Sequence, residues 1–98
     1  MRYATKVDIN HGEIRNGLRD VFGDDAVQDV SMYPRLGFDL IIYAGGAVAF
    51  LEVKQPRKAT KLTESEQDAR RRYGNLWHVV TTLEEALELM SPGRQSPL

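Results

Sequence analysis

Cysteine is absent from the 98 residues of this sequence. A disulfide framework and thiolate metal sites are therefore excluded, and carboxylate oxygens and two histidines remain as possible metal ligands. Long apolar runs are also absent. No segment is long and apolar enough to span a membrane, and the beginning lacks the apolar stretch of a signal peptide. Cytoplasmic residence is therefore the expectation.

A marked excess of basic residues is lacking too, because 13 Lys and Arg against 14 Asp and Glu give a formal net charge of −1. Nucleic-acid-binding domains are commonly basic, so the overall charge gives no sign of one. The glycines follow no phosphate-cradling spacing, and no Ser/His/Asp or Cys/His set for nucleophilic catalysis is evident. The length and the 42% hydrophobic content predict one domain, residues 1–90, followed by a flexible tail, residues 91–98.

What the sequence does contain is a pair of apolar segments, residues 38–43 and 48–53, rich in β-branched and aromatic residues. Between them lies Gly45-Gly46, which tolerates the positive φ angles of a two-residue turn. The pattern therefore predicts a β-hairpin. If the two glycines form the turn, Ile41 lies opposite Phe50.

The same register places Asp39 opposite Glu52, and a period of two places Lys54 on the same face. Like charges at opposed positions are destabilising unless they are neutralised, and Mg²⁺ commonly binds one or two carboxylates with waters and phosphate oxygens. The lysine would suit a phosphate. The alternative is that Asp39 and Glu52 are solvated strand ends screened by Lys54. The apolar hairpin argues against it, because unpaired charge inside a sheet is costly.

Gly37-Phe38-Asp39, about a dozen residues, and then Glu52-Val53-Lys54 resembles the signature of the PD-(D/E)XK nuclease superfamily. Gln67, on an expected helix, narrows the resemblance to the virus-type replication-repair nuclease (VRR-NUC) family, over roughly residues 10–82. Phe38 stands where the superfamily pattern has proline, a residue that shapes the strand and binds nothing.

The resemblance implies a restriction-endonuclease-like core and a Mg²⁺- or Mn²⁺-dependent DNA endonuclease, a hydrolase of phosphodiester bonds. Asp39, Glu52 and the main-chain carbonyl of Val53 would bind the metal, and Lys54 would assist catalysis. Stand-alone viral members are small homodimers that act on branched DNA such as four-way (Holliday) junctions. The resemblance therefore also implies a bacterial cytoplasm or that of a virus-infected host. The alternative is a non-catalytic nucleic-acid-binding or interaction module that keeps the fold.

Two further catalytic candidates rest on the resemblance. Glu13 would lie near the water shell of the metal, although its place three residues after Asn10 also fits a helix-capping box. Gln67 would orient the attacking water or the lysine, although an exposed helix position is the commoner role of glutamine. His11, near the helix start, is expected to be exposed.

The remaining pattern predicts helices over residues 10–22, 63–73 and 82–90 and strands over residues 26–33 and 76–81. Thr63 with Glu66, and Thr82 with Glu85, form capping boxes at the second and third helices. The predicted fold is α/β, a small mixed β-sheet flanked by helices in the order α-β-β-β-α-β-α. Basic residues that could contact nucleic acid beside the acidic centre are Arg35, Arg57, Lys58, Lys61 and Arg70.

Overall fold

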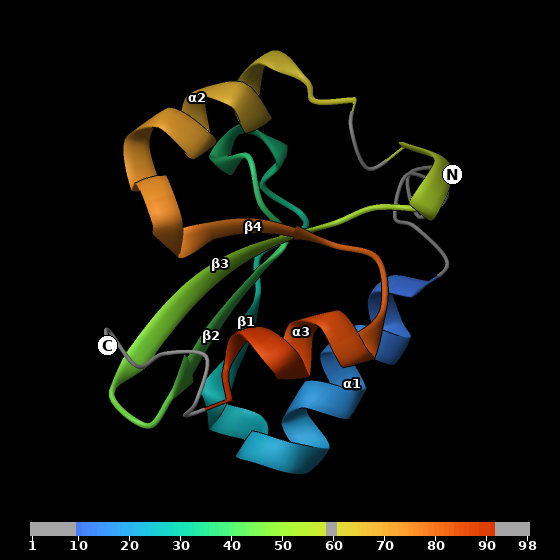
Figure 1. The fold of residues 1–98 in the computed structure, drawn as a ribbon, viewed down its shortest axis with the longest axis vertical. Helices are drawn as coiled ribbons and strands as arrows, with labels where there is room; N and C mark the ends of the chain where they lie inside the picture. The colour runs from blue at the N-terminus through green and yellow to red at the C-terminus, as the bar shows by residue number, and fades with distance from the viewer. Residues whose placement is uncertain (1–9, 59–60, 92–98) are drawn as a thin grey trace.

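The fold is that of a computed structural model that describes residues 10–58 and 61–91 (Figure 1). The helices are α1 (Asn10–Phe22), α2 (Glu64–Tyr73) and α3 (Leu83–Leu89), and the strands are β1 (Val27–Asp29), β2 (Leu40–Ala44), β3 (Ala47–Val53) and β4 (Trp77–Val80). Short 3₁₀ turns η2 (Asp24–Ala26), η3 (Pro34–Leu36), η4 (Pro56–Lys58) and η5 (Gly74–Leu76) connect them. This order confirms the predicted α-β-β-β-α-β-α succession. Most of the expected tail, residues 92–98, lies outside the described residues.

The four strands form one mixed sheet in the order β1-β2-β3-β4. The first three strands are antiparallel, and β4 lies parallel to β3 after a crossover through α2. Ile41 pairs with Phe50 as predicted, because Gly45 and Gly46 adopt φ angles of 58° and 83° and close a two-residue turn. The hairpin and its register therefore follow directly from the sequence.

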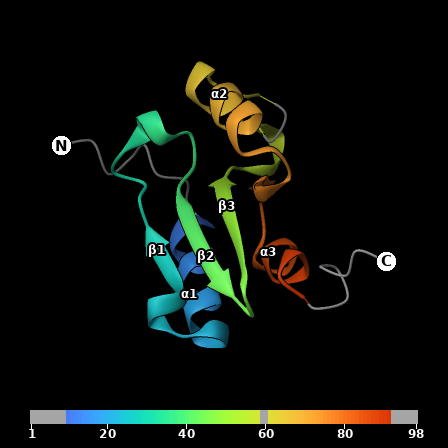
Figure 2. The same ribbon diagram turned by 90° about the vertical axis from the view of Figure 1, so that its left-hand side faces the viewer.

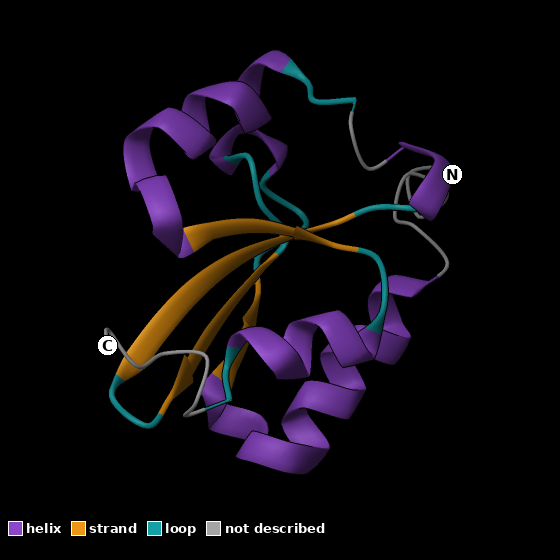
Figure 3. Cartoon of the chain, viewed as in Figure 1, coloured by secondary structure: helices purple, strands orange, loops and turns teal. Residues whose placement is uncertain are grey.

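Helices cover both faces of the sheet (Figures 1 and 3). On one face α1 and α3 pack on a core cluster that includes Leu18, Leu51 and Ala86. On the other face, here called the α2 face, Ala69 of α2 packs in a second cluster with Phe38 and Trp77 and with the partly buried Phe50 and Tyr73. Alternation along β3 sends Leu51 to the first face and Phe50 to the second. Glu52, two residues after Phe50, consequently faces α2.

The first strand is shorter than predicted, three residues instead of residues 26–33. The side chain of Asp29 accepts hydrogen bonds from the backbone N–H and the hydroxyl of Ser31, at 3.0 and 2.7 Å. Such a local side-chain bond turns the backbone away from the ladder. The chain then forms η3 before it re-enters the sheet as β2.

The starts of α2 and α3 agree with the sequence, with one difference in their caps. Thr63 and Glu66 form the predicted capping box of α2. At α3 the hydroxyl of Thr82 accepts from the backbone N–H of Glu85, but the carboxylate of Glu85 accepts from the backbone N–H of Thr81. The predicted box at α3 is thus only half formed.

Gly37 holds the loop before β2 against α2. Its φ is +82°, and a Cβ atom there would lie 2.4 Å from the carbonyl oxygen of Ser65. We expect Gly37→Ala to lower the free energy of unfolding, with about 1–2 kcal/mol from the left-handed backbone and about 1–3 kcal/mol from overpacking. Gly46→Ala is a matched control, since its φ is +83° and no atom lies within 4 Å of the added Cβ. Urea unfolding that shows equal losses for both variants would contradict close packing at Gly37.

Candidate active site

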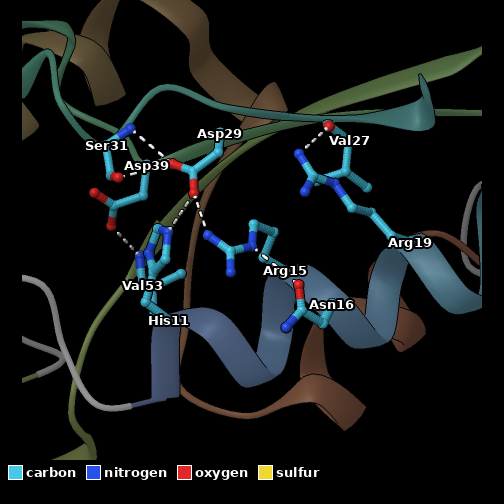
Figure 4. A network of polar contacts seen from close by, with 9 residues as sticks. All are labelled: His11, Arg15, Asn16, Arg19, Val27, Asp29, Ser31, Asp39 and Val53. Atoms are coloured by element: carbon cyan, nitrogen blue, oxygen red, sulfur yellow. Dashed lines mark hydrogen bonds and ion pairs between the residues drawn. The ribbon is translucent and has the colours of Figure 1, made fainter. Parts of the chain in front are cut away.

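Asp39 lies at the point where the ladder between β2 and β3 ends. The last pair of that ladder is Leu40 with Leu51, one residue before the predicted pair of Asp39 with Glu52. The backbone N–H of Asp39 donates to the carbonyl of Leu51 at 2.8 Å, and Oδ2 of Asp39 accepts from the backbone N–H of Val53 at 2.9 Å (Figure 4). The two acids therefore flank the point where the strands separate.

Glu52 lies on β3 beside Val79 of β4 and is only 8% exposed. Its carboxylate faces α2 together with the side chain of Lys54. The ammonium Nζ of Lys54 lies 2.9 Å from Oε1 of Glu66 and 3.9 Å from Oε2 of Glu52. The structure thus brings Glu52 and Lys54 together as predicted, and it adds a third charged group from α2.

The protonation of this cluster follows from its burial. Burial, the nearby charge of Asp39 and a hydrogen bond with Glu66 raise the pKa of Glu52 to about 9, against the weaker opposing effect of Lys54. Burial also acts to raise the pKa of Glu66. Its hydrogen bonds with Glu52, with the backbone of Thr63 and with Lys54 outweigh burial and lower its pKa. The pKa shifts of the two glutamates thus have opposite directions, and Glu66, the nearer of the two carboxylates to Nζ, is the ion-pair partner of Lys54.

The contact between Glu66 and Lys54 was not foreseen in the sequence, where the capping box already accounted for the glutamate. Glu66 does cap α2, because its Oε1 accepts from the backbone N–H of Thr63 at 2.9 Å. The same oxygen contacts Lys54. The sequence did contain a signal for this contact. Ala69 and Tyr73, three and seven residues after Glu66, pack toward the sheet, and this spacing puts Glu66 on the same face of the helix.

The two further catalytic candidates, Gln67 and Glu13, lie at exposed positions. Gln67 is exposed, and its amide donates to the carbonyl of Leu62 at 3.1 Å. Glu13 is exposed in the first turn of α1. The α1 residue that contacts the end of β3 is Asn10, whose Nδ2 donates to the carbonyls of Lys54 and Thr81 at 3.2 and 2.6 Å. Asn10 thus ties α1 to the strand ends, which the capping-box interpretation did not predict.

A partly buried polar network around Asp29 lies beside Asp39 (Figure 4). His11 is 4% exposed, so the prediction that it is exposed is wrong. Its Nε2 lies 3.0 Å from Oδ2 of Asp29, which also accepts from Nη1 of Arg15 at 2.8 Å. Although burial acts the other way, the bonds from His11, Ser31 and Arg15 hold the pKa of Asp29 well below its usual range.

This network reaches Asp39 through the backbone, because the N–H of Val30, the next residue after Asp29, donates to the carbonyl of Asp39 at 2.8 Å. We expect Asp29→Ala to lower the free energy of unfolding by about 1–3 kcal/mol, since it leaves the buried ring of His11 without its partner, whereas the partly exposed Arg15 can bind water instead. Asp25→Ala, at an exposed position, is the control. Similar urea midpoints for the two variants would show that the network contributes nothing.

The predicted basic contacts lie in the segments around the cluster. Arg35 is exposed in η3, Arg57 is exposed in η4, and Lys61 and Arg70 are exposed before and on α2. The backbone of Lys58 belongs to η4, but its side chain lies outside the described part of the structure. Exposure leaves the four described side chains accessible to a polyanion.

In the ranges 10–58 and 61–91, no group of three or more His, Cys, Asp or Glu side chains could hold a metal ion. No helix in those ranges combines the length and apolar character needed to cross a membrane. No protein-family model matches the sequence, and no curated protein or solved structure matches it significantly.

Proposed function

We propose that this protein is a metal-dependent endonuclease that hydrolyses DNA phosphodiester bonds, as its resemblance to the VRR-NUC family implies. The observation that supports this most is the convergence of Asp39, Glu52 and Lys54 at one end of the hairpin, with Glu52 nearly buried. Placing two repelling carboxylates there costs stability, and a bound cation would offset that cost.

The donor set fits Mg²⁺ or Mn²⁺. Both ions prefer oxygen ligands, and Mg²⁺ usually takes only one or two carboxylates while it keeps several waters. Asp39 and Glu52 supply the carboxylates in the proposal, and the carbonyl of Val53 supplies the third protein oxygen. The hydrogen bond from the N–H of Val53 to Oδ2 of Asp39 holds the backbone of Val53 beside that carboxylate. Glu52 must release its proton when it becomes a ligand.

A divalent cation bound here would lower the pKa of a water ligand and polarise the scissile phosphate. Lys54 would stabilise the negative charge that grows on the phosphate in the transition state. Glu66 acts as a positioning residue in this proposal, because it holds the lysine ammonium at 2.9 Å. Glu13 and Gln67 stay predictions. In the proposal Glu13 lies near the water shell of the metal, and Gln67 orients the attacking water or the lysine, as the resemblance implies.

Branched DNA is the proposed substrate and a homodimer the proposed assembly, both from the resemblance. A two-fold pair of sites suits a four-way junction, which offers two equivalent strands. Arg35, Arg57 and Lys61 would contact phosphates around the acidic centre, since all three are exposed.

One observation favours a second candidate, a non-catalytic module that binds nucleic acid. A protonated Glu52 beside a Lys54–Glu66 ion pair is satisfied without a metal. The two candidates differ in an assay of labelled four-way junction, flap and linear duplex DNA with Mg²⁺, Mn²⁺ or EDTA. The nuclease predicts metal-dependent cleavage, strongest on branched DNA. Binding without cleavage in either metal would instead establish the non-catalytic module.

A further inference from the structure

Large apolar side chains are exposed on one loop beside the carboxylates. Residues 30–39 connect β1 to β2, and within their middle part, the 31–36 loop, Met32 is 74%, Tyr33 59% and Leu36 39% exposed. Exposed apolar residues that occur singly need no explanation, whereas a group of them marks a contact surface. This loop therefore presents a small apolar surface.

The backbone of the 31–36 loop is tightly bonded. The N–H of Tyr33 donates to the carbonyl of Val30 at 2.9 Å, and the N–H of Leu36 donates to the carbonyl of Tyr33 at 3.0 Å. At its end, the carbonyl of Gly37 accepts from Nε1 of Trp77 at 2.8 Å. Because this backbone is already ordered, the exposed side chains can bind a partner with little further loss of conformational entropy.

The loop lies next to the carboxylate that would bind the metal. Asp39 follows Leu36 by three residues, and its carbonyl accepts from the N–H of Val30 at the start of the loop. Figure 2 shows the β1–β2 connection at the same end of the sheet as the end of β3. Arg35 is the one charged residue between residues 30 and 38, and it is exposed. The surface thus combines apolar side chains with a single cation beside the proposed site.

We infer that the 31–36 loop is a wedge for DNA branch points, with Tyr33 and Met32 stacking on a base that has lost its neighbour and Arg35 contacting an adjacent phosphate. This inference rests on the proposed function and specifies its substrate. Apolar and aromatic side chains that insert at a base step, or on which bases stack, bind without regard to sequence. In a continuous duplex every base is already stacked, so the loop would favour branched over linear DNA.

A second copy of this chain fits the surface less well. A stable protein interface buries roughly 800 Å² on each partner, and three side chains of one loop fall well short of that area. Charged residues are also depleted in the cores of such interfaces, whereas Arg35 lies between Tyr33 and Leu36. A cation among apolar side chains instead complements a base with its phosphate.

The test is a double cycle of protein and DNA changes, measured by fluorescence anisotropy in EDTA so that no cleavage occurs. The DNA is a four-way junction, the same junction with an abasic nucleotide at the branch point, and a linear duplex. We expect Tyr33→Ala to weaken junction binding roughly tenfold and duplex binding little. Tyr33→Phe keeps the ring and is expected to bind like the intact protein. Tyr43→Ala removes a tyrosine that is 49% exposed on the hairpin strand β2, and it is the matched control.

The abasic junction provides the decisive comparison. The intact protein is expected to bind the abasic junction about as weakly as Tyr33→Ala binds the complete junction. The affinity of Tyr33→Ala is expected to be the same for both junctions. Equal junction binding by Tyr33→Ala and Tyr43→Ala would overturn the inference. So would a change from dimer to monomer with unchanged DNA binding. If the protein binds junctions in this way but never cleaves them, the nuclease proposal fails and the wedge stands. If it binds no DNA, both fail.

Discussion

Asp39→Asn is expected to lower metal-dependent cleavage of branched DNA by at least about a hundredfold, because even indirect metal-site substitutions cost 10–100-fold. The amide oxygen that replaces Oδ2 can still accept from the backbone N–H of Val53, so the fold is expected to persist. What the substitution removes is the charge that binds the cation. Cleavage rates under single-turnover conditions with Mg²⁺ measure the effect.

Asp25→Asn is the matched control for this substitution, since Asp25 is exposed in η2. It is expected to leave the cleavage rate unchanged. Normal urea unfolding of Asp39→Asn would show that the loss is chemical and not structural. Cleavage by Asp39→Asn at the rate of the intact protein would remove this residue from the site.

The metal-free protein is expected to become less stable as pH rises from about 4.5 to about 9. Within this range Glu52 keeps its proton in the folded state, because its pKa is raised from 4.5 to about 9, whereas the unfolded chain has lost that proton. The folded state therefore binds more protons, and the free energy of unfolding falls by at most about 1.4 kcal/mol per pH unit. Urea unfolding at several pH values measures this slope.

Glu52→Gln tests the origin of the slope. Its amide resembles the protonated carboxyl but cannot ionise, so the fall between pH 4.5 and 9 is expected to vanish. Glu66 and Asp29 have lowered pKa values, so their contribution is complete above their ordinary pKa values and is lost only at lower pH. They therefore do not act in this window. Glu64→Gln, exposed on α2, is the control that keeps the slope. An equal slope in Glu52→Gln would contradict the assigned proton.

The same linkage predicts how metal affects stability. Since Glu52 must lose its proton to bind the ion, stabilisation by Mg²⁺ is expected to grow as pH rises toward 9. Glu52→Gln is expected to show little stabilisation at any pH.

Most of the fold could be predicted from local chemistry. The turn at Gly45-Gly46 set the register of the hairpin, and the capping box of Thr63 with Glu66 located the start of α2. The length of β1 could not be predicted, because the bonds between Asp29 and Ser31 end the strand in favour of a local turn. The crossover through α2 makes β4 parallel to β3. The residue pattern predicts a mixed sheet but not this pairing, which depends on tertiary packing.

The site could be predicted where its residues share one hairpin, because register alone brings Glu52 and Lys54 together with Asp39 nearby. Residues that come from other elements were missed. Packing of α2 brings Glu66 to Lys54, and packing of α1 brings His11 to Asp29. From the sequence, Glu66 was interpreted only as a helix cap and His11 only as an exposed residue. A single sequence shows periodicity directly, whereas it contains little information on long-range packing.

The central claim is that Asp39 and Glu52 bind one divalent cation together. The most direct measurement is a crystal structure of the protein grown with Mn²⁺ near pH 8, with the ion located by its anomalous scattering. The account predicts one Mn²⁺ coordinated by both carboxylates beside Val53. An ion bound elsewhere, or these two carboxylates without an ion while Glu52 stays bonded to Glu66, would contradict it.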